Sequence, residues 1–196
     1  GATSDRAQEY WKAVEQYWLR KQREDGGWNY KDNNESTASM TAAGLSSLYI
    51  VLDRGYARGG HKRAGTVLTA PERGLSWLAE GYSADRPRGV DEHRFYYYYG
   101  LERVGRASGR KFFREQDWFR SVAAVLLAEQ KQDGSWGNGL RDTAFGLLFL
   151  CHGRAPILMN KLEHADDWDV HLRDVATLTR HAQATFERMM NWQSFG

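Results

Sequence analysis

Side chains that could bind a metal ion gather in one short segment near the C-terminal end of the sequence. The segment reads His164-x-Asp166-Asp167-x-Asp169-x-His171. Imidazole and carboxylate groups are metal ligands, but a site also needs a rigid element that holds several of them in fixed geometry. The composition is that of a solvated acidic loop. We therefore predict no metal site and no cofactor.

Residue patterns typical of nucleophilic catalysis are not found either. The six histidines show no pairing with a nucleophile, and the sequence contains neither G-x-S-x-G nor a Gly-rich phosphate loop. Cys151 is the only cysteine, so it cannot form an internal disulfide, and we expect a small, buried, apolar residue. The motifs thus predict no catalytic residue.

Length and charge limit the classes of protein to which the chain could belong. The chain has 196 residues, 41% of them hydrophobic, with 27 Lys+Arg against 25 Asp+Glu. This is enough for one compact core, and the near-balanced charge gives no electrostatic signature of nucleic-acid binding. No apolar run is long enough for a membrane helix, and no signal peptide is recognisable. We expect a soluble domain of unknown location; a signal for export or for the cell envelope would lie outside this chain.

A seven-residue motif, Q-x-x-D-G-x-W, occurs twice, 108 residues apart. Its residues are Gln22, Asp25, Gly26 and Trp28 in the first copy and Gln130, Asp133, Gly134 and Trp136 in the second. Asp favours a turn and Gly accepts the left-handed conformation that ends a helix. The Trp offers a large flat surface against which a following helix can pack.

Each copy of the motif lies between two segments with helical patterns. The segment before it has one apolar stripe, and the segment after it, residues 41–52 or 143–151, is apolar nearly all round. The later segments share T-A-x-G-L, 102 residues apart. A helix with one stripe has solvent behind it, whereas a helix apolar all round must be covered. The pattern therefore predicts pairs of an outer and an inner helix.

A third, degenerate pair is expected between these two. Thr69-Ala-Pro-Glu72 is a capping box that predicts the start of an outer helix. The aromatic run at residues 95–101 has strand propensity. We nevertheless predict a helix there, because Asp91 and Glu92 suit a helix N-terminus and the run occupies the place of an inner helix.

The expected fold is all-α, with three helical hairpin repeats in two concentric layers over residues 1–155. Residues 156–196 form a polar connector and a C-terminal helix from Asp174 to about Met190, leading toward a following domain absent from this chain. One side of that helix carries Val175, Leu178, His181, Ala182, Phe186 and Met189.

The repeated turn between an outer and an inner helix resembles the repeat of squalene and oxidosqualene cyclases, and more loosely that of protein prenyltransferase β subunits. The resemblance covers roughly residues 5–152 and implies a partial α/α toroid. A group of bacterial proteins of unknown function, in which such a toroid precedes an uncharacterised domain, is similar in more detail. That similarity rests on Tyr98 to Gly105, Asp117-Trp118, Asp133 to Trp136, Asp142 to Phe145 and Leu148 to Leu150.

The resemblance concerns the fold. The catalytic, zinc-binding and thioester motifs of these families are not matched in this sequence. Cyclases use an Asp-x-Asp-Asp acid motif, and residues 166–169 show it only in reversed order and downstream of the repeats. Prenyltransferases hold zinc with Asp-x-Cys, but here Asp142 is followed by Ala144 at the cysteine position. The Cys-Gly-Glu-Gln thioester of complement-like toroids does not match residues 151–154.

We therefore expect a non-catalytic toroid-like module, a structural or interaction domain of a larger bacterial protein. Its partners would be other domains of that protein, another protein or a second copy, and not nucleic acid. The alternative is an enzyme or binding domain for a hydrophobic, terpenoid-like or carbohydrate ligand in an aromatic cavity. Candidate cavity residues are His93, Arg94, Tyr96, Tyr97 and Asp142, although core packing is the competing interpretation of the tyrosines.

Overall fold

The computed structural model describes residues 2–31, 35–55, 65–90, 93–163 and 173–195, and this part of the chain is mostly helical, with seven helices and 61% helix. The helices are α1 Ala2–Lys21, α2 Ala38–Gly55, α3 Gly65–Glu80, α4 Arg94–Ser108, α5 Trp118–Glu129, α6 Leu140–Gly153 and α7 Asp174–Phe186. The strands are β1 Phe112–Phe113, β2 Gln116–Asp117, β3 Ile157–Leu162 and β4 Asn191–Phe195.

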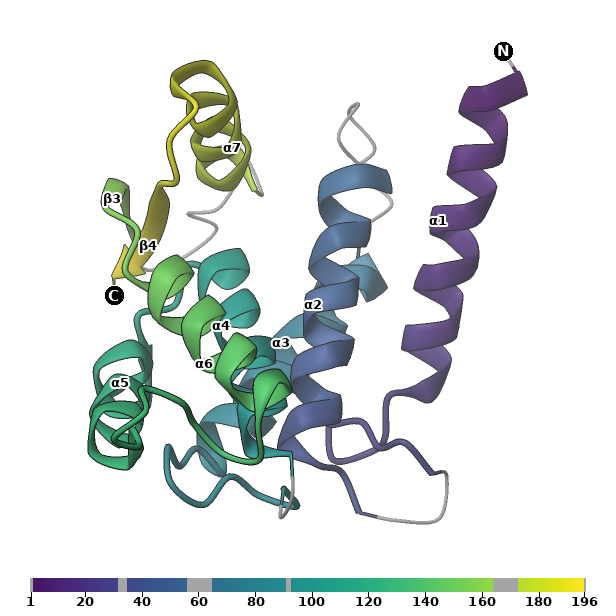
Figure 1. Cartoon of the computed structure of the whole chain (residues 1–196). Coiled ribbons are helices and arrows are strands. Elements are labelled where there is room, and N and C mark those ends of the chain that lie inside the picture. Colours follow the sequence, from purple (N-terminus) through teal and green to yellow (C-terminus); the bar gives the residue numbers. More distant parts are fainter. Residues whose placement is uncertain (1, 32–34, 56–64, 91–92, 164–172, 196) are drawn as a thin grey trace.

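The helices that follow the two motif copies, α2 and α6, lie on either side of α4. α2 packs on α4 and α4 packs on α6, while α1 and α3 pack on α2, and α5 packs on α4 and α6. Figure 1 shows α1 at one edge of this array and α5 at the opposite edge. The buried core runs through all of it and includes Trp28, Tyr98, Leu101 and Phe149.

The aromatic run forms a helix, as predicted, and not a strand. It lies in α4, where Phe95, Tyr97 and Tyr98 are buried. The helix ends at Gly109, which has φ +74° and donates its N–H to Gly105 O at 3.0 Å. Burial on one helical face thus outweighs the strand propensity of the individual aromatic residues.

The predicted start of the degenerate outer helix is wrong. α3 begins at Gly65, so Thr69 lies inside the helix instead of capping it, and Pro71 is an interior residue. Pro71 is buried, as is the neighbouring Ala70. Packing therefore outweighs the local preference of proline for the first turn of a helix.

The described residues are mostly helical, but the all-α prediction is incomplete because they also form two small two-stranded sheets. β1 and β2 form a short antiparallel hairpin before α5, and β3 pairs with β4 in parallel register, with α7 between them along the chain. The connector predicted as polar thus contains a strand. The apolar Ile157, Leu158 and Met159 lie in this strand.

The C-terminal helix is shorter than predicted and buries other residues. It ends at Phe186, because Glu187 takes a left-handed conformation with φ +49°. Its buried residues are Ala176 and Thr179. Leu178 is 52% and Phe186 67% exposed. The larger apolar side chains therefore do not form the packing face of this helix.

Candidate docking site

The first motif copy closes the turn after α1 with its own polar groups. Gln22 donates from Nε2 to Gly26 O at 2.8 Å. Asp25 accepts from the Gly27 N–H on Oδ1 at 3.0 Å. Gly26 has φ +92°, a left-handed conformation that suits glycine. The sequence prediction for the Asp and Gly positions is confirmed.

Trp28 joins this turn to the following helix, α2, through packing and a hydrogen bond. Its side chain is fully buried, and its backbone N–H donates to Thr41 Oγ1 of α2 at 3.1 Å. The indole N–H donates to Trp18 O of α1 at 2.9 Å. A Cβ placed on Gly44 of α2 would come within 2.6 Å of the indole ring. The Thr and Gly of the T-A-x-G-L segment are therefore the partners of the motif tryptophan.

The second motif copy forms the same hydrogen bonds in its turn. Gln130 donates from Nε2 to Gly134 O at 3.1 Å, and Asp133 accepts from the Ser135 N–H at 3.0 Å. Gly134 has φ +81°. The sequence repeat is thus a structural repeat at the level of individual atoms.

Trp136 is held like Trp28. Its backbone N–H donates to Thr143 Oγ1 of α6 at 3.1 Å, and its indole N–H donates to Leu126 O of α5 at 2.7 Å. The inner-helix glycine, Gly146, again faces the ring, but a Cβ there would lie 3.5 Å from it. The contact between ring and inner helix is therefore looser in the second copy.

Helix α3 docks on the first turn through polar contacts. Gln22 donates a second hydrogen bond from Nε2 to Ala70 O at 2.8 Å, and the Trp77 indole N–H donates to Asp25 Oδ2 at 3.0 Å. Burial raises the pKa of Asp25, but the hydrogen bonds from Gly27 N–H, Ser36 and Trp77 outweigh it, so the pKa lies below its usual value. The carboxylate is ionised at neutral pH.

Two further contacts complete this junction. Arg73 of α3 donates from Nη2 to Arg23 O at 2.9 Å and to Glu24 O at 2.8 Å. In α3, a Cβ on Gly74 would lie 2.7 Å from the Trp28 ring. Trp28 is therefore enclosed between α2 and α3. As predicted, a motif tryptophan is a packing surface for the next outer helix.

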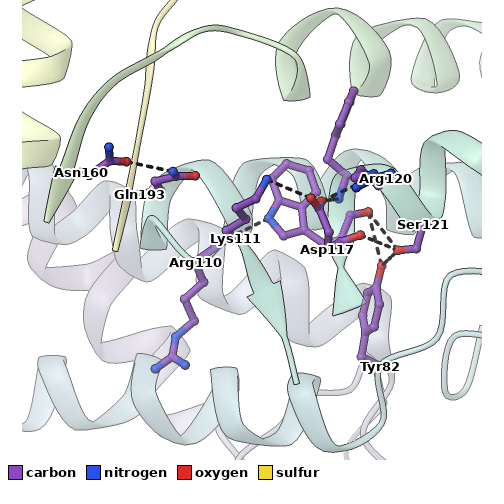
Figure 2. A network of polar contacts seen from close by, with 10 residues as sticks. Tyr82, Arg110, Lys111, Asp117, Arg120, Ser121, Asn160 and Gln193 are labelled. Carbon is purple, nitrogen blue, oxygen red and sulfur yellow. Dashed lines mark hydrogen bonds and ion pairs between the residues drawn. The ribbon is translucent and has the colours of Figure 1, made fainter. Parts of the chain in front are cut away.

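The next outer helix, α5, docks on the end of α3 by a different set of contacts (Figure 2). Tyr82 Oη lies 2.7 Å from Ser121 Oγ, and burial raises the Tyr82 pKa to about 12, so the phenol stays protonated. Asp117 caps α5 by accepting from the Phe119 and Arg120 backbone N–H groups. The degenerate repeat thus uses a phenol and a hydroxyl where the first repeat uses its motif residues.

The predicted cavity residues on α4 do not converge on one cavity. His93 is exposed, and Arg94 forms an ion pair with Glu129 of α5. Tyr96 is 40% exposed with its ring edge against a phenylalanine of α6, whereas Tyr97 is buried in the core. The core-packing interpretation therefore holds for Tyr97.

Asp142 lies in the first turn of α6, but it is not the N-cap, which is Gly139. Its Oδ2 accepts from the Asn138 N–H at 2.8 Å, and its Oδ1 accepts from Arg141 Nε at 3.0 Å. Burial raises the pKa of Asp142, but these two partners, with a smaller contribution from His93, hold it below its usual value. The carboxylate fixes the loop before α6 and stays ionised.

A pocket that no sequence motif predicted lies between α2, α4 and α7. Its volume is about 220 Å³, and four arginines line it: Arg103, Arg106, Arg173 and Arg180. Arg173 forms a bidentate pair with Asp53 of α2 at 3.0 and 3.1 Å. Because the two partners are 120 residues apart, no spacing rule could have found the pair. These contacts fasten the C-terminal segment to the inner helices.

The acidic segment from His164 to His171 lies outside the described residues. Within the described ranges, no group of three or more His, Cys, Asp or Glu side chains is placed to hold a metal ion. No helix in this part of the chain is long and apolar enough to cross a membrane. The chain matches no protein-family model, no curated protein and no solved structure with which it was compared.

Proposed function

We propose that the chain is a partial α/α toroid that acts by packing against another domain or protein and not by catalysis. The two turns with equivalent hydrogen bonds support a repeat architecture. The inner succession α2, α4, α6, with α1, α3 and α5 outside it, supports two concentric layers. The resemblance to bacterial proteins in which a toroid precedes another domain supports a role inside a larger protein.

The observation that carries this proposal is an apolar face of α6 that no described residue covers. Leu140 is 87%, Leu147 48% and Leu148 36% exposed, and Cys151 is also exposed. Helical periodicity places these four residues on one side of the helix. The prediction of a buried Cys151 is therefore wrong, because it assumed that the last inner helix is covered like the first. Contiguous apolar surface of this kind marks an interaction site.

Carboxylates between the two helices of a pair support a structural role for the polar groups. Asp25 and Asp142 are ionised and bound to backbone N–H groups of their own loops. An ionised carboxylate cannot serve as a general acid at neutral pH. These groups stabilise turns and helix starts.

The test compares the chain with a Leu140→Glu/Leu148→Glu variant in dye binding and sedimentation. We expect the unmodified chain to bind an apolar fluorescent dye or to self-associate with rising concentration, and the variant to do so less. Leu178→Glu on α7 is the matched control, since Leu178 is also exposed, and it should leave both readouts unchanged. A monomer at every concentration that binds no dye would contradict the proposal.

A further inference from the structure

We infer that the second turn is a socket for one further helix from a partner polypeptide, built in the manner of α3. This second-turn socket consists of Leu127, Gln130, Asp133, Gly134 and Leu147. The inference rests on the proposed interaction function and adds the surface and the chemistry of the partner. The first turn already has its helix, α3, in place, and the second turn has the same hydrogen bonds without one.

The glycines of the two turns show where the further helix would lie. A Cβ placed on Gly26 would lie 2.8 Å from the carbonyl oxygen of Arg73 in α3, so the helix backbone rests directly on this glycine. A Cβ on Gly134 would meet only Gln130, at 4.0 Å. Gly26 is buried and Gly134 is exposed. The two turns have the same hydrogen bonds and differ in what lies on them.

Two leucine pairs show the same difference. Leu45 of α2 is fully buried, and its side chain would lie 2.9 Å from a Cβ on Gly74 of α3. Its counterpart 102 residues later, Leu147, is 48% exposed. Leu19 packs against the core, whereas Leu127, 108 residues later, is 69% exposed. Apolar residues are thus retained in the second repeat at positions that are covered in the first.

The polar groups of the second-turn socket also have hydrogen-bonding positions that a further helix could use. Gln22 divides its Nε2 donors between Gly26 O and Ala70 O of α3, whereas Gln130 makes only the bond to its own turn among those described. Asp133 takes both of its described hydrogen bonds from Ser135, on Oδ1. The Oδ2 position that receives an indole N–H in the first turn is thus available in the second.

The α3 contacts define the chemistry of the occupant. The helix would donate a guanidinium to the turn carbonyls, as Arg73 does, and an indole N–H to the carboxylate, as Trp77 does. Trp136 is already buried, at 3% exposed, so the occupant would lie on the glycine and the two leucines of the socket and not on the ring. The first turn therefore predicts a helix with Arg-x-x-x-Trp on its docking side.

A partner polypeptide fits this socket better than a second copy of the chain. The residues of α3 that would be needed are already used: Trp77 is 3% and Leu78 1% exposed. A second copy would have to release α3 from its own repeat before donating it. That exchange would open a buried core around Trp28.

The experiment measures binding of a labelled peptide with the sequence of residues 65–82 to the full chain by fluorescence anisotropy. Isolated helices of this length are marginal in water, so the peptide is stapled between positions 72 and 76. Both positions are exposed in α3. We expect saturable binding, weakened at least about tenfold by Leu127→Glu in the chain or by Trp77→Ala in the peptide. Leu178→Glu in the chain should leave the affinity unchanged.

Each other outcome overturns the inference and bears differently on the proposed function. Equal affinity for the Leu127→Glu chain, or no saturation up to about 1 mM, excludes an α3-like helix at this turn. If dye binding at α6 persists in that case, the interaction function stands and only the socket fails. If the chain alone associates and Leu127→Glu abolishes the association, the occupant is a second copy. Absence of both dye and peptide binding removes both proposals.

Discussion

The same substitution at the equivalent inner-helix glycines should have opposite effects in the two repeats. A Cβ on Gly44 would lie 2.6 Å from the Trp28 ring, which is fully buried and which a Cβ on Gly74 of α3 would also approach to 2.7 Å. A Cβ on Gly146 would lie 3.5 Å from the Trp136 ring, an ordinary van der Waals distance. We therefore expect Gly44→Ala to destabilise the fold and Gly146→Ala to stabilise it.

The magnitudes follow from two opposing contributions. Replacing glycine by alanine inside a helix gains about 0.8–1 kcal/mol at both positions. Overpacking at Gly44 costs about 1–3 kcal/mol, so the net loss there is about 0–2 kcal/mol. Gly146→Ala meets no such overpacking, so it should stabilise the fold by the full gain of about 0.8–1 kcal/mol. For a chain of this size the two variants should differ by several degrees in Tm, at roughly 2–4 °C per kcal/mol.

Thermal and urea unfolding followed by circular dichroism at 222 nm provide the assay. The free energies of unfolding of the two variants are compared with that of the unmodified chain under one buffer condition. Equal shifts of the same sign would refute the reasoning, since they would mean that the two tryptophans contact their inner helices equally closely.

Three more predictions concern buried or turn side chains. Tyr97 is buried and its hydroxyl has no hydrogen-bond partner among the described residues, so Tyr97→Phe should be neutral or stabilising in urea unfolding; Tyr98→Phe removes a 2.6 Å hydrogen bond and should cost about 0.5–1.5 kcal/mol. Trp136→Ala should cost roughly 3–5 kcal/mol, and a loss below about 1 kcal/mol would mean that the motif does not hold the repeat together. Because the folded pKa of Asp25 is lowered, its stabilisation is present above the unfolded pKa, about 3.9, and is lost as pH falls through the folded value. The advantage of the unmodified chain over Asp25→Asn in thermal unfolding should therefore be full at pH 7 and shrink below about pH 4; an advantage that does not change with pH would contradict it.

The repeats were predictable because their signals are local. Helical periodicity and an Asp-Gly turn both depend on residues that are close together in the chain. The helix pairs and both motif turns could therefore be predicted from the sequence. The aromatic run of α4 was predictable from its place in the repeat, although single-residue propensity favours a strand.

Contacts between distant segments could not be predicted in this way. The pairing of β3 with β4 joins residues more than 30 positions apart, and Arg173 meets Asp53 across 120 positions. The exposure of Cys151 depends on whether a further helix follows α6 in space. A sequence pattern shows that a helix face is apolar, but not whether anything covers it.

Cys151 offers the most direct test of the uncovered α6 face. As the only cysteine, it reports on that face without any substitution. The measurement is the rate at which a thiol reagent modifies it in the folded chain, relative to the urea-unfolded chain under matched conditions. We predict a folded rate within about tenfold of the unfolded rate, because the side chain is exposed. Protection of about a hundredfold or more would show that α6 is covered and would contradict the account.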